Sequence, residues 1–310
     1  MTSFLSVIVP VYNEELVIDR MYKRLTEVLS GRDFRYEIIL VNDGSRDRTI
    51  DLAREICEKD PNVKLISFSR NFGHQIAVTA GMDRAKGNMI ALIDADLQDP
   101  PEVLLEMVEK WKEGYQVVYG TRARRKGESF IKLITASLFY RILRRLTSVD
   151  IPLDTGDFRL MDAKVVASLR KMQERNRFVR GMVSWVGFKQ GKVEYVREPR
   201  FAGETKYPFR KMMKFALDGI FSFSHIPLKL ASSLGFFCAI LSFALIGYAL
   251  YSKYFLPDRT IPGWTSVFIA IVFIGGIQLI SIGILGEYIG RIYEEAKDRP
   301  LYIVDEDINF

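Results

Sequence analysis

Two long uncharged stretches constrain this chain more than any other feature. Charged residues make up 26% of the protein, yet residues 230–252 and 260–286 contain no Asp, Glu, Lys or Arg. Each run exceeds the ~20 residues that an α-helix needs to cross a bilayer. We therefore predict two membrane-spanning helices, at about 230–252 and 264–286. A buried core helix is the alternative, but cores rarely need such long uncharged runs.

The connection between the two runs sets their arrangement. Residues 253–259 are short and contain the breaker Pro257, so the spans form a hairpin with both flanks on one side. Basic residues mark the cytoplasmic side of a membrane. They lie on the flanks at Arg210, Lys211, Lys214, Lys229, Arg291, Lys297 and Arg299, against Lys253 and Arg259 in the connection. We predict a multi-pass protein of the inner (plasma) membrane, with the bulk of the chain and both termini cytoplasmic.

The distribution of charge limits the kinds of partner that the chain is expected to bind. The net charge is +6, and between residues 121 and 149 eight Lys or Arg face one Glu, interleaved with apolar residues. This pattern favours a membrane surface and a phosphorylated substrate, not a nucleic acid. Segments 129–146 and 209–225 are predicted to be interfacial amphipathic helices, with ordinary surface helices as the alternative. Two cysteines far apart exclude a disulfide framework and suit a reducing compartment.

Residues 1–100 alternate between strand-like and helix-like patterns. Apolar runs predict strands at 5–10, 36–41, 64–69 and 89–94, and helical spacing predicts helices at 14–29, 47–59 and 75–85. Such βα alternation implies an α/β fold with a mostly parallel sheet, whose ligands collect at the carboxyl ends of the strands.

Acidic residues follow these predicted strands. Glu14, Asp43 and the pair Asp94 and Asp96 each lie at a strand end, so we expect them on one rim. Asp43, in the turn Asn-Asp-Gly-Ser, would normally be read as a turn former. Two close aspartates repel and are best tolerated around a divalent cation, which implies Mg²⁺ or Mn²⁺. No P-loop motif is present, which disfavours kinase or ATPase chemistry.

Three motifs carry a family resemblance. Val-Pro-Val-Tyr-Asn-Glu-Glu at 9–15, Val-Asn-Asp-Gly-Ser-Arg-Asp-Arg-Thr at 41–49 and Ile-Asp-Ala-Asp-Leu-Gln-Asp-Pro-Pro-Glu at 93–102 resemble glycosyltransferase family 2. The resemblance implies the GT-A fold, in which a mostly parallel sheet binds a nucleotide-sugar. Segments 153–159 and 201–208 are similar to the branch that makes dolichol-phosphate mannose. Residues 286–295 look closest to bacterial polyprenyl-phosphate glucosyltransferases of the GtrB type.

This resemblance implies an activity. We expect inverting transfer of a hexose, foremost glucose, from a UDP-sugar to polyprenyl (undecaprenyl) phosphate at the cytoplasmic membrane face. Transfer of another sugar, of the mannose or aminoarabinose type, and a non-catalytic sugar-nucleotide-binding subunit stay open. The chain lacks the Gln-x-x-Arg-Trp signature of processive members, which disfavours polymer synthesis.

The resemblance also assigns roles residue by residue. The donor falls to Pro10, Tyr12, Glu14, Asp43 and Asp94, and the metal to Asp94, Asp96 and Gln98. Asp157 occupies the place of a base or an acceptor-positioning acid. A phosphate monoester with a second pKa of about 6 is already ionised near neutral pH, so proton abstraction would contribute little.

The remaining expectations concern the acceptor and the domains. Arg122, Arg200 and Lys206 are candidates to bind the acceptor phosphate, with solvated surface charges as the alternative, and we expect a structural role for His74. The predicted domains are a catalytic domain at 1–208, a juxtamembrane helix at 209–225, the hairpin at 226–290 and a cytoplasmic tail at 291–310. Small residues in the second span allow a homo-oligomer, namely Gly275, Gly276, Gly286 and Gly290.

Overall fold

The computed structural model describes residues 3–122, 155–198, 226–255 and 263–310. The chain divides into two units. One, the sheet unit, contains Met1–Gly219 and Arg299–Phe310, and the other, the hairpin unit, contains Ile220–Asp298. The predicted interfacial helices at 129–146 and 209–225 lie outside the described residues.

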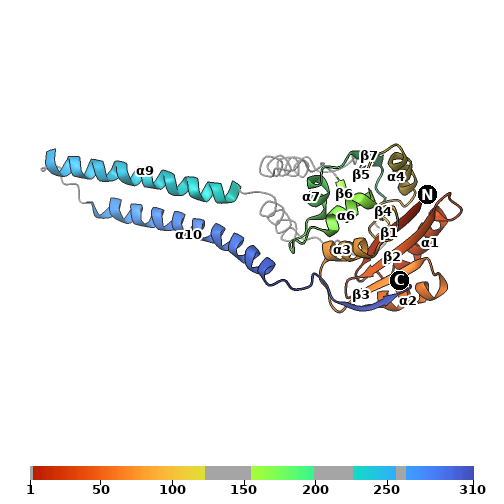
Figure 1. Cartoon of the computed structure of the whole chain (residues 1–310). Coiled ribbons are helices and arrows are strands. Elements are labelled where there is room, and N and C mark those ends of the chain that lie inside the picture. The colour runs from red at the N-terminus through yellow and green to blue at the C-terminus, as the bar shows by residue number, and fades with distance from the viewer. Residues whose placement is uncertain (1–2, 123–154, 199–225, 256–262) are drawn as a thin grey trace. The chain divides into compact units, whose positions relative to one another are not determined.

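The sheet unit is built on one eight-stranded sheet in the order β7-β5-β6-β4-β1-β2-β3-β8 (Figure 1). β1 pairs in parallel with β2 and β4, β2 with β3, and β5 with β7, whereas β6 runs antiparallel to β4 and β5, and β8 antiparallel to β3. The predicted α/β fold with a mostly parallel sheet is confirmed. The strands are β1 (Phe4–Val11), β2 (Arg35–Asn42), β3 (Val63–Phe68), β4 (Met89–Leu92), β5 (Val117–Arg122), β6 (Thr155–Asp162), β7 (Gln190–Tyr195) and β8 (Val304–Ile308).

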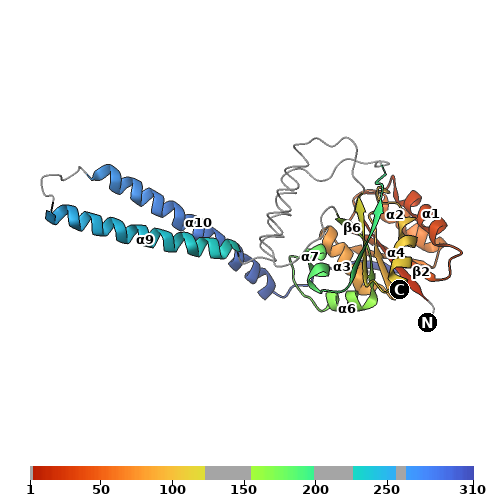
Figure 2. The same ribbon diagram turned by 90° about the horizontal axis from the view of Figure 1, so that it is seen from above.

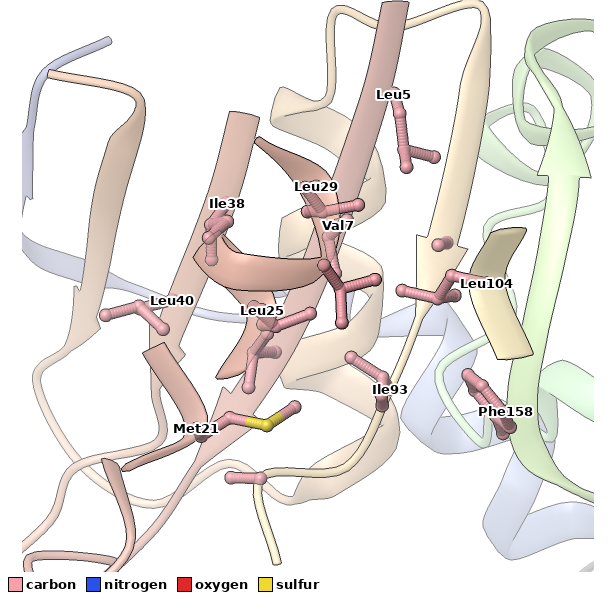
Figure 3. Close-up of a cluster of buried hydrophobic side chains, with 14 of the residues drawn as sticks. Leu5, Val7, Met21, Leu25, Leu29, Ile38, Leu40, Ile93, Leu104 and Phe158 are labelled. Atoms are coloured by element: carbon pink, nitrogen blue, oxygen red, sulfur yellow. The ribbon is translucent and has the colours of Figure 1, made fainter. Parts of the chain in front are cut away.

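Helices cover the central strands, which are buried on both faces. Alternate residues of β1 point to opposite sides of the sheet. Leu5 and Val7 join a cluster with α1 and α4, which Figure 3 shows, whereas Ile8 faces α3. A Cβ added to Gly81 of α3 would lie 2.3 Å from the Ile8 side chain, so this glycine allows α3 to pack closely on the sheet. The helices are α1 (Ile18–Leu29), α2 (Thr49–Lys59), α3 (His74–Arg84), α4 (Val103–Lys112), α6 (Ala163–Arg170) and α7 (Val179–Trp185).

Two features of the sheet unit differ most from the sequence prediction. The helix expected at 14–29 begins at Ile18, and Leu16 is 69% exposed. Residues 12–17 are instead a loop, in which the Val17 N–H donates to the Glu14 carbonyl at 3.0 Å. The residues after the hairpin also do more than follow it as a tail, because Val304–Ile308 adds β8 to the sheet edge. The five residues of β8 include three acids, so they lack the apolar and β-branched pattern that predicts a strand.

The hairpin unit consists of two long helices that lie side by side, α9 (Ile226–Phe255) and α10 (Trp264–Ala296) (Figures 1 and 2). Within the described residues, one helical segment is long and apolar enough to cross a membrane, Phe273–Ala296, and none of its apolar window is buried. Leu228–Cys238 in α9 is a shorter apolar segment. One of the two predicted spans therefore meets this criterion, and the second stays a prediction.

Candidate active site

Loops at the carboxyl ends of β1, β2 and β4 form an acidic rim, made of residues 12–17, 43–49 and 94–98. Hydrogen bonds from backbone N–H groups of the first loop to side-chain hydroxyls of the second join these two loops. Asn13 N donates to Ser45 Oγ at 3.0 Å, and Glu14 N donates to Thr49 Oγ1 at 2.8 Å. Asn13 adopts a φ of 53°, in the left-handed region, which turns the chain away from the strand. Pro10 is the second-last residue of β1, and Tyr12 and Glu14 follow the strand. Binding of the donor by these three residues stays a prediction.

Asp43 accepts hydrogen bonds from the protein's own backbone through its carboxylate. Its side chain is buried, and its carboxylate accepts hydrogen bonds from Phe72 N at 2.7 Å and Gly73 N at 3.0 Å. Burial raises the pKa of Asp43, and these two N–H donors offset part of that rise. The carboxylate therefore fixes the loop that leads into α3, and binding of uridine by Asp43 stays a prediction.

The next residue can only be glycine in this geometry. Gly44 has a φ of +65°, and an added Cβ would lie 2.4 Å from the carbonyl carbon of Arg70. The turn of the Asn-Asp-Gly-Ser motif is therefore pressed against the loop before α3, which explains why this position takes a residue without a side chain.

The loop after β4 carries the predicted cation ligands. Leu97 has a φ of 57°, and Gln98 N donates to Asp96 Oδ1 at 3.1 Å, which folds the loop back on itself. Gln98 Nε2 donates to the Glu198 carbonyl at 3.4 Å, so its Oε1 is the atom that can face a cation. The described residues contain no group of three His, Cys, Asp or Glu that could hold a metal alone.

Asp94 is short of positive charge. Among the described residues no Lys or Arg pairs with it, and its ion-pair contact is His74 Nε2, at 3.7 Å from Oδ1. Burial, together with the negative charges of Asp157, Asp99 and Asp96, raises the pKa of Asp94 to about 6. Carboxylates in this state suit Mg²⁺ or Mn²⁺, which commonly take one or two protein carboxylates and complete their shell with water and substrate phosphates. The residues present fit such a cation.

Asp157 lies beside this loop because of strand pairing. β6 runs antiparallel to β4 with Arg159 opposite Leu92, and continuing that register sets Asp157 across from Asp94. Side chains from three elements meet there and form the Asp157 cluster, made of His74, Gln75, Asp157 and Arg180. Asp157 contacts Arg180 Nε at 2.8 Å, Gln75 Nε2 at 3.3 Å and His74 Nε2 at 3.3 Å.

The charged neighbours of Asp157 and His74 determine the pKa values of these two side chains. Burial alone would raise the pKa of Asp157, but the Arg180 guanidinium and His74 outweigh it and hold this pKa well below its usual range. Burial alone would lower the pKa of His74, but the hydrogen bond to Asp157 and the charge of Asp94 raise it to about 9. Asp157 is therefore an ionised carboxylate at neutral pH and a weak proton acceptor.

The side chains of the predicted acceptor cations lie outside the described part of the chain. Arg122 is the last residue of β5, opposite Tyr195 of β7, and its side chain lies outside the described part of the chain. Arg200 and Lys206 also lie outside it. Binding of the acceptor phosphate by these three residues therefore stays a prediction.

Sequence reasoning missed several residues of the site. Gln75 and Arg180 carry no motif of their own, and His74, for which we expected a structural role, lies between Asp94 and Asp157. Asp99 was also missed, although it directly follows the predicted ligand Gln98. It is 1% exposed, accepts a hydrogen bond from Tyr195 Oη at 2.5 Å and lies 3.3 Å from Arg197 Nε.

The sheet unit has a GT-A-like α/β fold, with its carboxylates at the carboxyl ends of the parallel strands, where open α/β sheets bind ligands. The model of glycosyl transferase family 2 matches residues 6–170, more than half of the chain, and a GtrB C-terminal hairpin model matches residues 226–292. The chain belongs to glycosyltransferase family 2, and it is a glycosyltransferase.

Relatives match nearly the whole chain. It is 60% identical to the uncharacterized glycosyltransferase YkcC of Bacillus subtilis over 97% of this chain and 93% of the relative. It is 41% identical to the bactoprenol glucosyl transferase of Shigella phage SfV over 98% of both chains. Among solved structures, it is similar to glucosyl-3-phosphoglycerate synthase of Mycobacterium tuberculosis with Mn²⁺, UDP and phosphoglyceric acid, at 18% identity and a TM-score of 0.49, over 71% and 76% of the two chains.

Proposed function

We propose that this chain transfers glucose from UDP-glucose to polyprenyl phosphate at the cytoplasmic face of the plasma membrane, with inversion at the anomeric carbon. The observation that carries the proposal is the 41% identity to a bactoprenol glucosyl transferase over 98% of both chains, the C-terminal hairpin included. A likeness limited to the sheet unit would speak for the family alone.

The acidic rim supports binding of the donor. Tyr12, Glu14 and Asp43 would hold the uridine end, and Asp94 would lie at the diphosphate. Asp94, Asp96 and Gln98 would hold Mg²⁺ or Mn²⁺, which neutralises the charge that develops on the leaving diphosphate. The shortage of positive charge at Asp94, described above, supports this assignment.

The acceptor side needs positioning more than proton transfer. In the proposed reaction an oxygen of the lipid phosphate forms a bond to the anomeric carbon while the bond to UDP breaks. The attacking phosphate is largely ionised at neutral pH, so Asp157 would act as a fixed negative charge beside the sugar, where positive charge develops. Arg122, Arg200 and Lys206 would bind the lipid phosphate.

The membrane part serves the lipid substrate. We propose that α9 and α10 both cross the bilayer, with the sheet unit and both flanks of the hairpin cytoplasmic. The two charge-free runs and the match to the GtrB hairpin model support two spans. Glycines of α10 would allow close contact with a second copy, since a Cβ added to Gly275, Gly276, Gly286 or Gly290 meets nothing within 4 Å.

A transfer assay tests the proposal. Purified protein in detergent would be given undecaprenyl phosphate, Mn²⁺ or Mg²⁺, and radiolabelled UDP-glucose or, in parallel, GDP-mannose. We expect label in the lipid phase from UDP-glucose, and its loss in Asp96→Asn and Asp157→Asn. Glu109→Gln is the matched control, because this carboxylate is exposed on α4 and pairs with Lys112.

Each outcome has a meaning. Lipid product from GDP-mannose alone would replace the sugar and keep the reaction class. Metal-dependent UDP binding without product from any donor would favour a non-catalytic sugar-nucleotide-binding subunit. Equal activity in the two aspartate variants and in Glu109→Gln would refute the site.

A further inference from the structure

Donors from two helices hold the Asp157 carboxylate. Arg180 of α7 donates from Nε to Oδ1 at 2.8 Å and from a terminal nitrogen to Oδ2 at 3.3 Å. Gln75 of α3 donates from Nε2 to Oδ2 at 3.3 Å. Both carboxylate oxygens therefore accept hydrogen bonds within the protein, and rotation of the carboxylate would break several of them together.

Gln75 also ties the two helices to each other. Its Oε1 accepts a hydrogen bond from Val179 N at 3.0 Å, and Val179 directly precedes Arg180. One amide group therefore orients Asp157 and fixes the start of the helix that carries the guanidinium. The three positions form a closed triangle across segments that are 23 to 104 residues apart.

The backbone of β6 is fixed at the same point. Arg159 is 4% exposed, and its guanidinium donates to the Gly156 carbonyl at 3.0 Å and to the Asp157 carbonyl at 3.3 Å. A buried guanidinium is costly unless its donors are used, and here they hold the main chain on both sides of the Asp157 side chain. Main chain and side chain are thus restrained separately.

We propose that Arg180 and Gln75 are positioning residues that hold the Asp157 carboxylate in one orientation toward the reaction centre. This inference rests on the proposed function, since it takes Asp157 as the group beside the reacting sugar. In this role the two residues act through Asp157 and not on the substrate directly. Small misplacements of a reacting or stabilising group lower the rate of the chemical step more than the binding of substrate.

Steady-state kinetics of variants test this assignment. Substitution of residues that hydrogen-bond to metal ligands typically costs about 10-fold to 100-fold in activity. We expect the same scale for Asp157, with kcat falling about 100-fold in Arg180→Ala and about 10-fold in Gln75→Ala. The KM for UDP-glucose and for the lipid phosphate should stay within about threefold of the parent values, because uniform binding is untouched. Arg180→Lys should fall between Arg180→Ala and the parent, since one ammonium cannot replace the guanidinium fork.

Matched controls remove similar contacts elsewhere. Arg54→Ala breaks a forked ion pair to Glu306, and Gln116→Ala breaks a hydrogen bond from Lys189 N to the amide oxygen. Both should keep the parent kcat. A fall in kcat in these variants equal to that in Arg180→Ala and Gln75→Ala would overturn the assignment.

Two further readouts separate positioning from a general structural role. A non-denaturing concentration of guanidinium chloride should restore part of the activity of Arg180→Ala, whereas sodium chloride at equal ionic strength should not. In an Asp157→Asn background, adding Arg180→Ala should cost less than about threefold, because residues that act as a unit are not additive. Full additivity, or a rise in the lipid-phosphate KM with kcat unchanged, would overturn the proposal and in the second case make Arg180 a ligand of the acceptor.

The inference and the proposed function fail differently. If the parent protein transfers no sugar to lipid phosphate, the proposed function is wrong. If the parent is active and Arg180→Ala and Gln75→Ala match it, only the positioning role is wrong. Should Arg180→Ala fail to fold, Arg180→Lys and Gln75→Ala give the same test.

Discussion

Asp94 and Asp157 are two carboxylates that flank one histidine, and they differ in the cations around them. Asp157 has a guanidinium at 2.8 Å, whereas Asp94 pairs with no Lys or Arg in the described part of the chain. The pKa of Asp157 is accordingly held well below its usual range by Arg180, against the effect of burial. Burial and neighbouring acids raise the pKa of Asp94 to about 6.

This difference in neighbouring cations gives the two aspartates different roles. Asp157 contacts both Arg180 and His74 and offers a fixed negative charge. Asp94 has only the His74 contact at 3.7 Å in the described residues, and it offers a site for a cation that arrives with substrate. Environments that shift the pKa values of neighbouring acids in opposite directions commonly give those acids different roles within one active site. The comparison therefore predicts that a substitution at Asp94 changes the metal concentration needed for transfer, and that a substitution at Asp157 does not.

The largest expected effect is on metal dependence. Asp94→Asn should lower the transfer rate by about 100-fold or more, the scale of losing one electrostatic contact at a reaction centre, and should raise the Mn²⁺ concentration needed for half-maximal rate. Asp157→Asn should lower the rate with no change in that concentration. Rates measured across a Mn²⁺ titration check both, with Glu109→Gln as the control. Equal shifts in the two variants would break the comparison.

The same contrast explains what could be predicted from the sequence. Asp43, Asp94 and Asp96 were expected on one rim because parallel strands bring their carboxyl ends to one edge, a rule that needs only strand order. Arg180 reaches Asp157 through a short helix after β6, and Gln75 reaches it from α3. No local pattern encodes contacts between side chains 23 and 82 residues apart, so these partners required the tertiary structure.

The start of α1 and the strand β8 were not predicted for a related reason. The apolar spacing of 14–29 continues a helical pattern to Leu16, but the backbone before Ile18 is used to join the first two loops of the acidic rim. β8 was missed because its alternation is carried by acids, and its pairing partner β3 lies far back in the chain. In both places a tertiary contact outweighs local preference.

The second prediction concerns the backbone of the acidic rim. Gly44→Ala should destabilise the protein by about 3 kcal/mol, because it adds left-handed strain and a clash with the Arg70 backbone. Gly31→Ala is the matched control: it has a φ of +70° but nothing within 4 Å of an added Cβ, so only strain of about 1 kcal/mol is expected. Thermal unfolding in detergent measures both, and UDP binding should weaken only in Gly44→Ala. Equal losses of stability would show that the close contact is not needed.

A third prediction concerns buried Asp99, which directly follows Gln98. Tyr195 donates from its hydroxyl to buried Asp99, in the segment after the acidic rim, and its ring packs edge-on against Phe158, next to Asp157, at 5.5 Å. Tyr195→Phe leaves the Asp99 carboxylate short of a donor, which should cost about 1 to 2 kcal/mol. Tyr115→Phe is the control, since the Tyr115 hydroxyl makes no hydrogen bond within the described residues. A loss of stability in Tyr195→Phe no larger than in the control would show that the Asp99 carboxylate does not depend on this donor.

The smallest expected effect lies at the edge of the sheet, away from both carboxylates. Tyr302, just before β8, stacks on Phe68 at 5.1 Å and donates from its hydroxyl to Asp83 at 3.0 Å. Tyr302→Phe keeps the stacked ring and loses one partly exposed hydrogen bond, so unfolding should become easier by about 0.5 kcal/mol. The transfer rate and its Mn²⁺ dependence should not change, because no contact of this ring reaches Asp94 or Asp157 in the described structure. A fall in rate larger than the loss of stability explains would show that the edge strand acts on the chemistry, and the comparison would then need a third region.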